Sequence, residues 1–234
     1  MLDMESSDAR FRIAAAKRML YREGCDSGTG GQFSARVENE EALWISRFGE
    51  YFDESAPSTV VKLGYDLRVI GSGREVPPAS FHAAIFQARP DVNAIVHTHS
   101  FHAASFSTTK RTIGMYHEQA SIIFEDQALF EEDGLAPVAD SRRVVDALGD
   151  KSVLLMRGHG VLVASRSIEV AAITAIVVET AARFHLTCEV AGGVECSVAE
   201  MLAIRDRYRA HYLPNMWEAN LRRLRRTDSD LWLS

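Results

Sequence analysis

The sequence has few of the features that mark specialised classes of protein. It contains 3 cysteines, an odd number with no CxxC spacing, which predicts free thiols in a reducing compartment and excludes a disulfide framework. The longest strongly apolar stretch, 170–182, is interrupted by Thr174, Glu179 and Thr180 and is shorter than the roughly 20 apolar residues of a membrane span. The first ten residues contain no apolar segment typical of a secretory signal. We therefore expect a cytoplasmic protein that crosses no membrane.

An excess of basic residues is also missing. Lys and Arg number 26 against 32 Asp and Glu, so the net charge is −6 and nucleic acid is a poor candidate partner. With 47% hydrophobic and 25% charged residues, the 234-residue chain can bury a full core without disulfides or a structural metal. We find no repeat, low-complexity tract or linker. We therefore expect one domain over 1–234, with a C-terminal helix and tail at about 197–234.

Periodicity predicts an alternation of helices and short strands. Helical spacing of apolar residues is found at about 8–23, 79–88, 167–189 and 198–211. Strand-like segments between turn residues occur at 33–37, 42–46, 60–63, 67–70, 94–99, 152–156 and 160–164. The first four favour an antiparallel meander. An Arg-rich tail with Trp217 and Trp232 follows Pro214, and we expect this tail to pack on a neighbouring subunit.

The segment His97-Thr98-His99 is the sharpest local indication of chemistry. Residues i and i+2 of a strand face the same side, so two imidazoles there can share one metal ion. Alone, the pattern is as compatible with hydrogen-bonded core histidines. His159 adds a third ligand, because the glycines on both sides of it allow close approach of backbone and ligand. Three neutral histidines with an open coordination position are typical of a catalytic metal site.

The other histidines have weaker interpretations. We expect His82 to be a packed residue beside the site and His102 to be either a helix-start residue or a site residue, whereas His185 and His211 on long helices should be surface or interface residues. Tyr116, His117 and Glu118 follow an apolar segment that we expect to be a strand, and His117 and Glu118 are candidates for acid–base catalysis.

A glycine-rich segment, Gly28-Thr29-Gly30-Gly31-Gln32, could hold an anion on its backbone N–H groups. It is neither a P-loop nor a dinucleotide motif, because it lacks the GK[ST] ending and precedes a strand-like segment. The alternative is a simple turn. A nucleotide is therefore not indicated.

Three segments together resemble the class II aldolase/adducin-like family. They are the glycine-rich segment continued to Arg36, the run 81–99 with its R-P-D-x-N-A-I-V-H-x-H motif, and Gly158-His159-Gly160-Val161. The resemblance covers about 8–190. It implies a three-layer α/β/α fold around a central, mainly antiparallel sheet, and a homotetramer with active sites at subunit interfaces. It also implies a divalent metal, Mn²⁺ or Zn²⁺, held by His97, His99 and His159.

The departures from the family pattern concern the substrate. Sugar-phosphate aldolases of the family have a Ser-Ser-Glu run whose Glu is the acid–base, and here Pro78 stands at about that position. Their phosphate loop has Asn at the position of Gln32, and their Thr-Gly pair becomes Phe48-Gly49. The candidate substrate-binding residues are therefore Gly31, Gln32, Ser46, Arg47 and Gly49. Arg47 suits a second carboxylate through paired hydrogen bonds, unless it faces solvent or pairs with Glu50.

These departures favour loss of CO₂ over aldol cleavage. A proline cannot transfer a proton, and loss of general acid–base help typically costs ~10²–10⁴-fold in rate. Decarboxylation instead requires an electron sink, which a divalent cation supplies. The pattern is similar to the metal-dependent branch of the family that decarboxylates aromatic ortho-hydroxy acids, including 3-hydroxy-2-methylpyridine-4,5-dicarboxylate of vitamin B6 breakdown. This implies a carboxy-lyase for a small aromatic carboxylate, with Tyr116, His117 or Glu118 as catalytic residues.

Two alternatives remain open. The chain could be an aldolase or epimerase for a non-phosphorylated hydroxy-carbonyl substrate, with an acid–base from another residue. It could also be a non-catalytic, adducin-like structural module. The three histidines disfavour the module, because a structural protein does not need an open metal site.

Overall fold

A seven-stranded sheet forms the centre of the computed structural model, which describes residues 8–26, 28–71, 79–131 and 140–233. The strands are β1 (Gln32–Arg36), β2 (Ala42–Ile45), β3 (Val61–Gly64), β4 (Ala94–Thr98), β5 (Gln127–Phe130), β6 (Val153–Met156) and β7 (Gly160–Ser165). Their order is β3-β2-β1-β4-β7-β6-β5. Every neighbouring pair is antiparallel except β5 with β6, which confirms the mainly antiparallel sheet.

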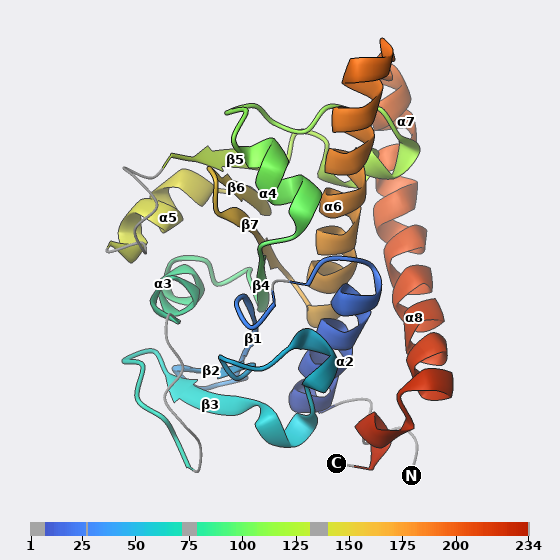
Figure 1. The fold of residues 1–234 in the computed structure, drawn as a ribbon. Coiled ribbons are helices and arrows are strands. Elements are labelled where there is room, and N and C mark those ends of the chain that lie inside the picture. Colours follow the sequence, from blue (N-terminus) through green and yellow to red (C-terminus); the bar gives the residue numbers. More distant parts are fainter. Residues whose placement is uncertain (1–7, 27, 72–78, 132–139, 234) are drawn as a thin grey trace.

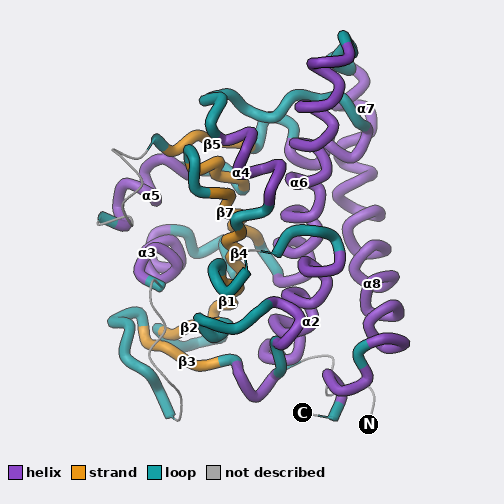
Figure 2. Tube along the Cα trace, viewed as in Figure 1, coloured by secondary structure: helices purple, strands orange, loops and turns teal. Residues whose placement is uncertain are grey.

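Helices cover both faces of this sheet (Figure 1). One face carries α3 (Ser80–Ala88) and α5 (Ser141–Leu148). The other carries α2 (Ala9–Arg22), α4 (Phe101–Ser107), α6 (Ile168–Ala191), α7 (Val198–Arg207) and α8 (Leu213–Thr227). Figure 2 shows the strands as a layer between the two groups of helices. The predicted three-layer α/β/α fold is confirmed.

Strand β4 lies in the middle of the sheet and is buried on both faces. Ile95 packs into the cluster beneath α3, and Val96 packs into the cluster beneath α6. Since side chains alternate along a strand, His97 lies on the α3 face together with Ile95. The aromatic ring of Phe81 in α3 meets the His97 ring edge-on, with centroids 5.5 Å apart. The His97 side chain is therefore held at the end of a central, rigid strand.

Helix α6 is the longest helix of the described residues and forms much of the core. The Ser167 side chain caps its start by accepting the Val170 N–H, and Gly192 ends it in the left-handed region. By length and composition α6 is apolar enough to cross a membrane. However, 67% of its most apolar 18-residue segment is buried inside the protein. Burial of a core helix explains its apolar composition.

Two of the expected strands are absent. Residues 67–70 form only an isolated bridge between Leu63 and Val69, because Leu67 turns the chain at φ 67°. The apolar segment before Tyr116 forms no strand with any of the described residues. The amide side chain of Gln127 instead accepts the Ile113 N–H and donates to the Ile113 carbonyl oxygen. A side chain thus replaces the strand partner that the sequence pattern suggested.

The C-terminal region also corrects the expectation from sequence. Pro214 does not end the helical region but lies in the first turn of α8, where a missing N–H is harmless. A π-helical turn, Tyr208–Tyr212, connects α7 to α8. Trp217 is only 4% exposed, and Trp232 packs edge-on against Phe11. Trp217 is therefore buried and Trp232 half-buried on the chain's own residues, and packing of the tail on a neighbouring subunit stays a prediction.

Candidate metal centre

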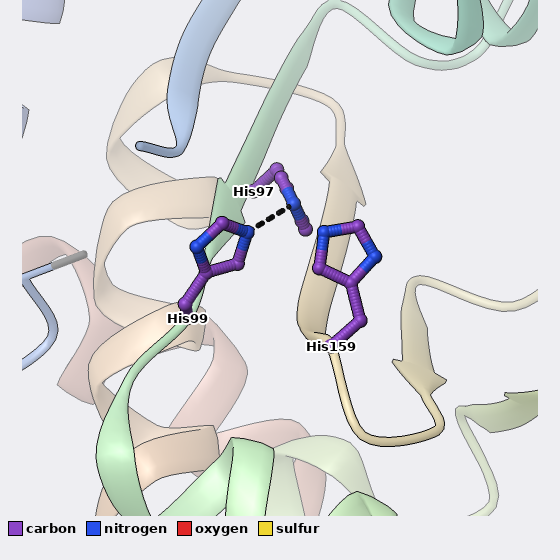
Figure 3. Close-up of side chains that lie close together, drawn as sticks. All are labelled: His97, His99 and His159. Atoms are coloured by element: carbon purple, nitrogen blue, oxygen red, sulfur yellow. Dashed lines mark hydrogen bonds between the residues drawn. The ribbon is translucent and has the colours of Figure 1, made fainter. Parts of the chain in front are cut away.

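Three histidines converge at the end of β4 (Figure 3). His97 lies on the strand, His99 follows its last residue, and His159 lies in the bend between β6 and β7. One ligand nitrogen from each lies within 4.8 Å of the others. Strands β4 and β7 are paired, with His97 opposite Leu162, which brings two distant segments together.

A backbone contact orients the innermost ring. The Nδ1–H of His97 donates to the Val161 carbonyl oxygen at 3.0 Å, so the Nε2 lone pair points toward the other rings. This Nε2 is 2.9 Å from Nε2 of His99. Nitrogens bound to one tetrahedral Zn²⁺ lie roughly 3.3 Å apart, given Zn–N bonds of about 2.0–2.1 Å. The nitrogen–nitrogen distances in the cluster range from 2.9 Å to at most 4.8 Å, on either side of that value. The three residues therefore fit a divalent metal.

Burial keeps the His97 and His99 rings in the form that binds metal. Desolvation, reinforced by neighbouring His99 and His159, holds the pKa of His97 well below its ordinary value of 6.5. Desolvation and the nearby His159 lower the pKa of His99 to about 4. Neutral imidazoles carry the lone pair that a cation needs. The described residues place no carboxylate in this cluster.

The two glycines around His159 have different tasks. Gly158 turns the chain at φ 66°, a conformation that suits glycine, and its N–H donates to the hydroxyl of Ser107 in α4. A Cβ at Gly160 would lie 2.2 Å from the Thr98 carbonyl oxygen and 3.1 Å from the His99 ring. Gly160 therefore permits a close approach between β7 and the segment of the other two ligands.

The glycine-rich segment lies beside the histidines, because Gln32 is opposite His97 in the β1–β4 ladder. The Gln32 side chain is buried, and its Oε1 has no hydrogen-bond partner among the described residues. Gly31 precedes it at φ 77°. The Gly49 N–H donates to the Thr29 carbonyl oxygen at 3.3 Å, so the two predicted substrate-binding segments lie side by side.

The remaining predicted substrate ligands differ in their exposure. Ser46 is buried, and its hydroxyl accepts the Phe33 N–H at 3.0 Å. Arg47 is exposed. Glu50 is buried and forms an ion pair with Lys17 instead, with Oε1 of Glu50 3.4 Å from Nζ of Lys17. The alternative pairing of Arg47 with Glu50 is therefore disfavoured, and its role as a carboxylate ligand stays a prediction.

Tyr116, His117 and Glu118 contact the C-terminal half of α6 and the turn before α8. The His117 ring stacks on Phe184 at 4.3 Å, and the Tyr116 ring lies 4.9 Å from that of His185. Glu118 shares a hydrogen bond with Tyr208, which helps to raise the tyrosine pKa after the larger effect of desolvation. An acid–base role for the three residues stays a prediction.

The structure also places the remaining histidines. His82 is fully buried as expected, with Nδ1 2.7 Å from the Ser34 hydroxyl. His211 is exposed, but His185 is buried and its Nδ1 accepts the Gly114 N–H. The expectation of a surface position for His185 was wrong. The local sequence could not show this, because the hydrogen-bond partner of His185 is 71 residues away in the chain. Pro77 and Pro78 lie outside the described residues.

One polar pair was missed altogether. His102, the second residue of α4, lies 2.6 Å from the buried carboxylate of Glu179 in α6. The only indication in the sequence was Glu179 itself, a carboxylate inside the apolar stretch 170–182. Periodicity cannot reveal a partner 77 residues away.

The chain is similar in sequence to several characterised proteins. It is 29% identical over 199 residues to the 4-hydroxy-3-prenylphenylpyruvate oxygenase/4-hydroxy-3-prenylbenzoate synthase of Streptomyces roseochromogenus, covering 82% of this chain and 72% of the relative. It is 28% identical to the decarboxylase NovR of Streptomyces niveus, covering 87% and 78%. It is also 29% identical to the L-fuculose phosphate aldolase of Escherichia coli, covering 79% and 85%.

The fold has solved counterparts. An aldolase II superfamily protein from Pseudomonas syringae superposes with a TM-score of 0.84 at 27% identity, over 95% of this chain and 94% of that one. The family model of the class II aldolase and adducin N-terminal domain matches residues 11–186, which include all three histidines of the cluster. The chain therefore belongs to the class II aldolase and adducin family.

Proposed function

We propose that the protein is a metal-dependent lyase that releases CO₂ from an aromatic ortho-hydroxy carboxylic acid. The observation that carries the proposal is the cluster of His97, His99 and His159, in which no carboxylate of the described residues takes part. A divalent cation there, Mn²⁺ or Zn²⁺, supplies a Lewis acid that withdraws electrons from a substrate oxygen. The cluster thus offers an electron sink without the usual proton carrier of an aldolase.

The residues around the cluster suit a hydroxy acid. The buried Oε1 of Gln32 has no partner in the part of the chain that the structure describes, and an unpaired buried acceptor costs about 1–3 kcal/mol unless a ligand donor meets it. A substrate hydroxyl supplies such a donor. Arg47 is exposed beside this segment and is suited to a second carboxylate. An aromatic hydroxy dicarboxylate, such as 3-hydroxy-2-methylpyridine-4,5-dicarboxylate of vitamin B6 breakdown, has all of these groups.

The relatives support the same chemistry. One is named a decarboxylase, and another is named for a hydroxylated, prenylated aromatic acid. The identity to an L-fuculose phosphate aldolase favours a second candidate, aldol cleavage or epimerisation of a non-phosphorylated hydroxy-carbonyl substrate. This candidate requires a proton carrier to replace the one lost at Pro78.

The test is metal analysis followed by a CO₂-release screen of hydroxy-aromatic mono- and dicarboxylates. The metal-loaded protein is expected to form CO₂ and the decarboxylated ring in equal amounts. Chelated protein and His97→Ala protein serve as controls and should form neither. Full activity of a metal-free preparation, or no CO₂ from any acid in the screen, contradicts the proposal.

We further propose a homotetramer in the cytoplasm. Large apolar side chains remain exposed in the single chain, including Phe101 at 73% and Val190 at 91%. Exposed apolar area of this kind suits a subunit interface. Sedimentation at micromolar concentration should give four times the mass of the chain, and an active monomer would contradict the assembly.

A further inference from the structure

The pair formed by His102 and Glu179 has the construction of a proton-transfer dyad. Nδ1 of His102 is 2.6 Å from Oε1 of Glu179. The same oxygen accepts the backbone N–H of His102 at 3.0 Å, and Oε2 accepts the backbone N–H of Ala103 at 2.9 Å. The carboxylate is thus buried and fixed by three donors.

This arrangement determines which imidazole nitrogen is available. An ionised carboxylate only accepts hydrogen bonds, and two backbone donors already point at it. Nδ1 of His102 must therefore donate, which leaves the lone pair on Nε2. The His102 side chain is 33% exposed, so Nε2 can exchange a proton with solvent while Glu179 stays buried. In many catalytic histidines one ring nitrogen donates to a carboxylate that holds the ring in place, and the other ring nitrogen transfers the proton.

The helix that carries His102 is attached to both ligand segments of the metal centre. Three residue steps separate His102 from His99, so their Cα atoms are at most about 11 Å apart. At the other end of α4, the Ser107 hydroxyl accepts the N–H of Gly158, the neighbour of His159. In Figure 1, α4 lies beside α6, which carries Glu179. The dyad is therefore built onto the same framework as the histidine cluster.

We propose that His102 is the catalytic acid–base of this enzyme and that Glu179 is its positioning residue. The inference rests on the proposed lyase function and identifies its proton carrier. His102 in its doubly protonated form gives the Nε2 proton to the ring carbon that bears the departing carboxylate. The carbon–carbon bond then breaks, its electron pair returns to the ring and the hydroxyl oxygen, and CO₂ leaves. The neutral imidazole regains a proton from water.

The dyad supplies a proton carrier to a chain in which Pro78 stands at about the position of the acid–base of the family aldolases. His117, an alternative carrier, is held differently. Its Nδ1 accepts the Gln119 N–H at 3.4 Å, its ring stacks on Phe184, and no carboxylate of the described residues is hydrogen-bonded to it. Among these histidines, His102 has the hydrogen bonding that a proton carrier requires.

A purely structural role makes a different prediction. Glu179 also caps the start of α4, which stabilises the helix whether or not His102 transfers protons. The substitution His102→Asn separates the two roles, because the Asn amide can occupy the place of Nδ1 and donate to Glu179 but cannot carry a proton. The exposed histidine His211 provides the matched control His211→Asn.

The experiment measures kcat, metal content and thermal unfolding of these variants. His102→Asn should bind metal and unfold like the wild type but lose ~10²–10⁴-fold in kcat with little change in KM. His102→Ala should lose as much and recover part of the rate when imidazole is added. His211→Asn should be unaffected. Wild-type kcat in His102→Asn would overturn the proposal.

A second measurement does not depend on activity. Nitrogen-15 NMR of histidine-labelled protein should find neutral His102 protonated at Nδ1, and a proton on Nε2 instead would overturn the proposed arrangement. The failure of the two proposals can also be told apart. If the wild type cleaves L-fuculose 1-phosphate and releases no CO₂, the decarboxylation is wrong, and the same variants test the dyad on the aldol reaction.

Discussion

His97 donates its Nδ1–H to the carbonyl oxygen of Val161, 3.0 Å away on the neighbouring strand β7. This bond connects the segment of two histidines to the segment of the third. It also fixes the nitrogen that faces the centre, because a carbonyl oxygen can only accept. The geometry of the site therefore depends on the pairing of β4 with β7 as much as on the histidines themselves.

Removing one histidine should abolish metal binding without unfolding the chain. His159 lies in an exposed bend and is less buried than His97, so His159→Ala should retain the fold. Two remaining imidazoles leave a site with too few protein ligands. Elemental analysis should find less than a tenth of the wild-type metal, and His211→Ala should keep it all. Stoichiometric metal in His159→Ala would contradict the assigned ligands.

Gly160→Ala should damage the site through the backbone. The new Cβ would lie 2.2 Å from the Thr98 carbonyl oxygen, so β7 must move away from the segment of His97 and His99. We expect metal affinity to fall about 10–100-fold, as it does when groups that orient ligands are lost. Gly149→Ala is the control, since its Cβ would meet nothing within 4 Å and its strain is remote from the site. Equal metal affinities of Gly160→Ala and the wild type would contradict this prediction, because they would show that β7 can move without disturbing the ligands.

Arg47→Ala tests the substrate end of the site. Arg47 is exposed and is not engaged by Glu50, which pairs with Lys17. If Arg47 binds a second carboxylate, kcat/KM for a dicarboxylate should fall by ~1.5–3 kcal/mol of transition-state stabilisation. The rate with the matching monocarboxylate should change little. An equal effect on both substrates, or no effect on either, contradicts this role.

His82 should make the fold sensitive to acid. Burial lowers the pKa of His82 from 6.5 to about 3. Between these two pH values the imidazole is protonated in the unfolded chain but neutral in the folded chain. Its stabilising contribution is complete above pH 6.5 and falls by about 1.4 kcal/mol per pH unit toward pH 3. Denaturant unfolding of His82→Leu should show a correspondingly shallower pH slope. Identical slopes would mean that His82 is protonated in the folded state.

The sequence was sufficient for features that depend on local pattern. The alternation of β4 and the glycines around His159 are visible in short segments, and both lead to the histidine cluster. The cap at Ser167 and the helix after it follow from the same kind of local pattern. The glycine-rich segment lies near the histidine cluster, where Gln32 is opposite His97 in the β1–β4 ladder, and its role in binding substrate stays a prediction.

Features that depend on distant partners could not be predicted in this way. The backbone of Ile113 pairs with the side chain of Gln127, 14 residues away, and forms no ladder with the described strands. Tryptophan is a residue type common at interfaces, but Trp217 in α8 is buried against its own chain. Glu179 looked like an interruption of an apolar stretch, and its partner His102 becomes evident only when α4 packs on α6.

The most direct test of the central claim gives one metal-loaded preparation two substrates in separate reactions. One is 3-hydroxy-2-methylpyridine-4,5-dicarboxylate or a hydroxyphthalate labelled with carbon-13 in its carboxylates, and the other is L-fuculose 1-phosphate. We expect labelled CO₂ from the aromatic acid and no cleavage of the sugar phosphate. Rapid cleavage of L-fuculose 1-phosphate, with no CO₂ from either aromatic acid, would contradict a decarboxylase and make this chain an aldolase.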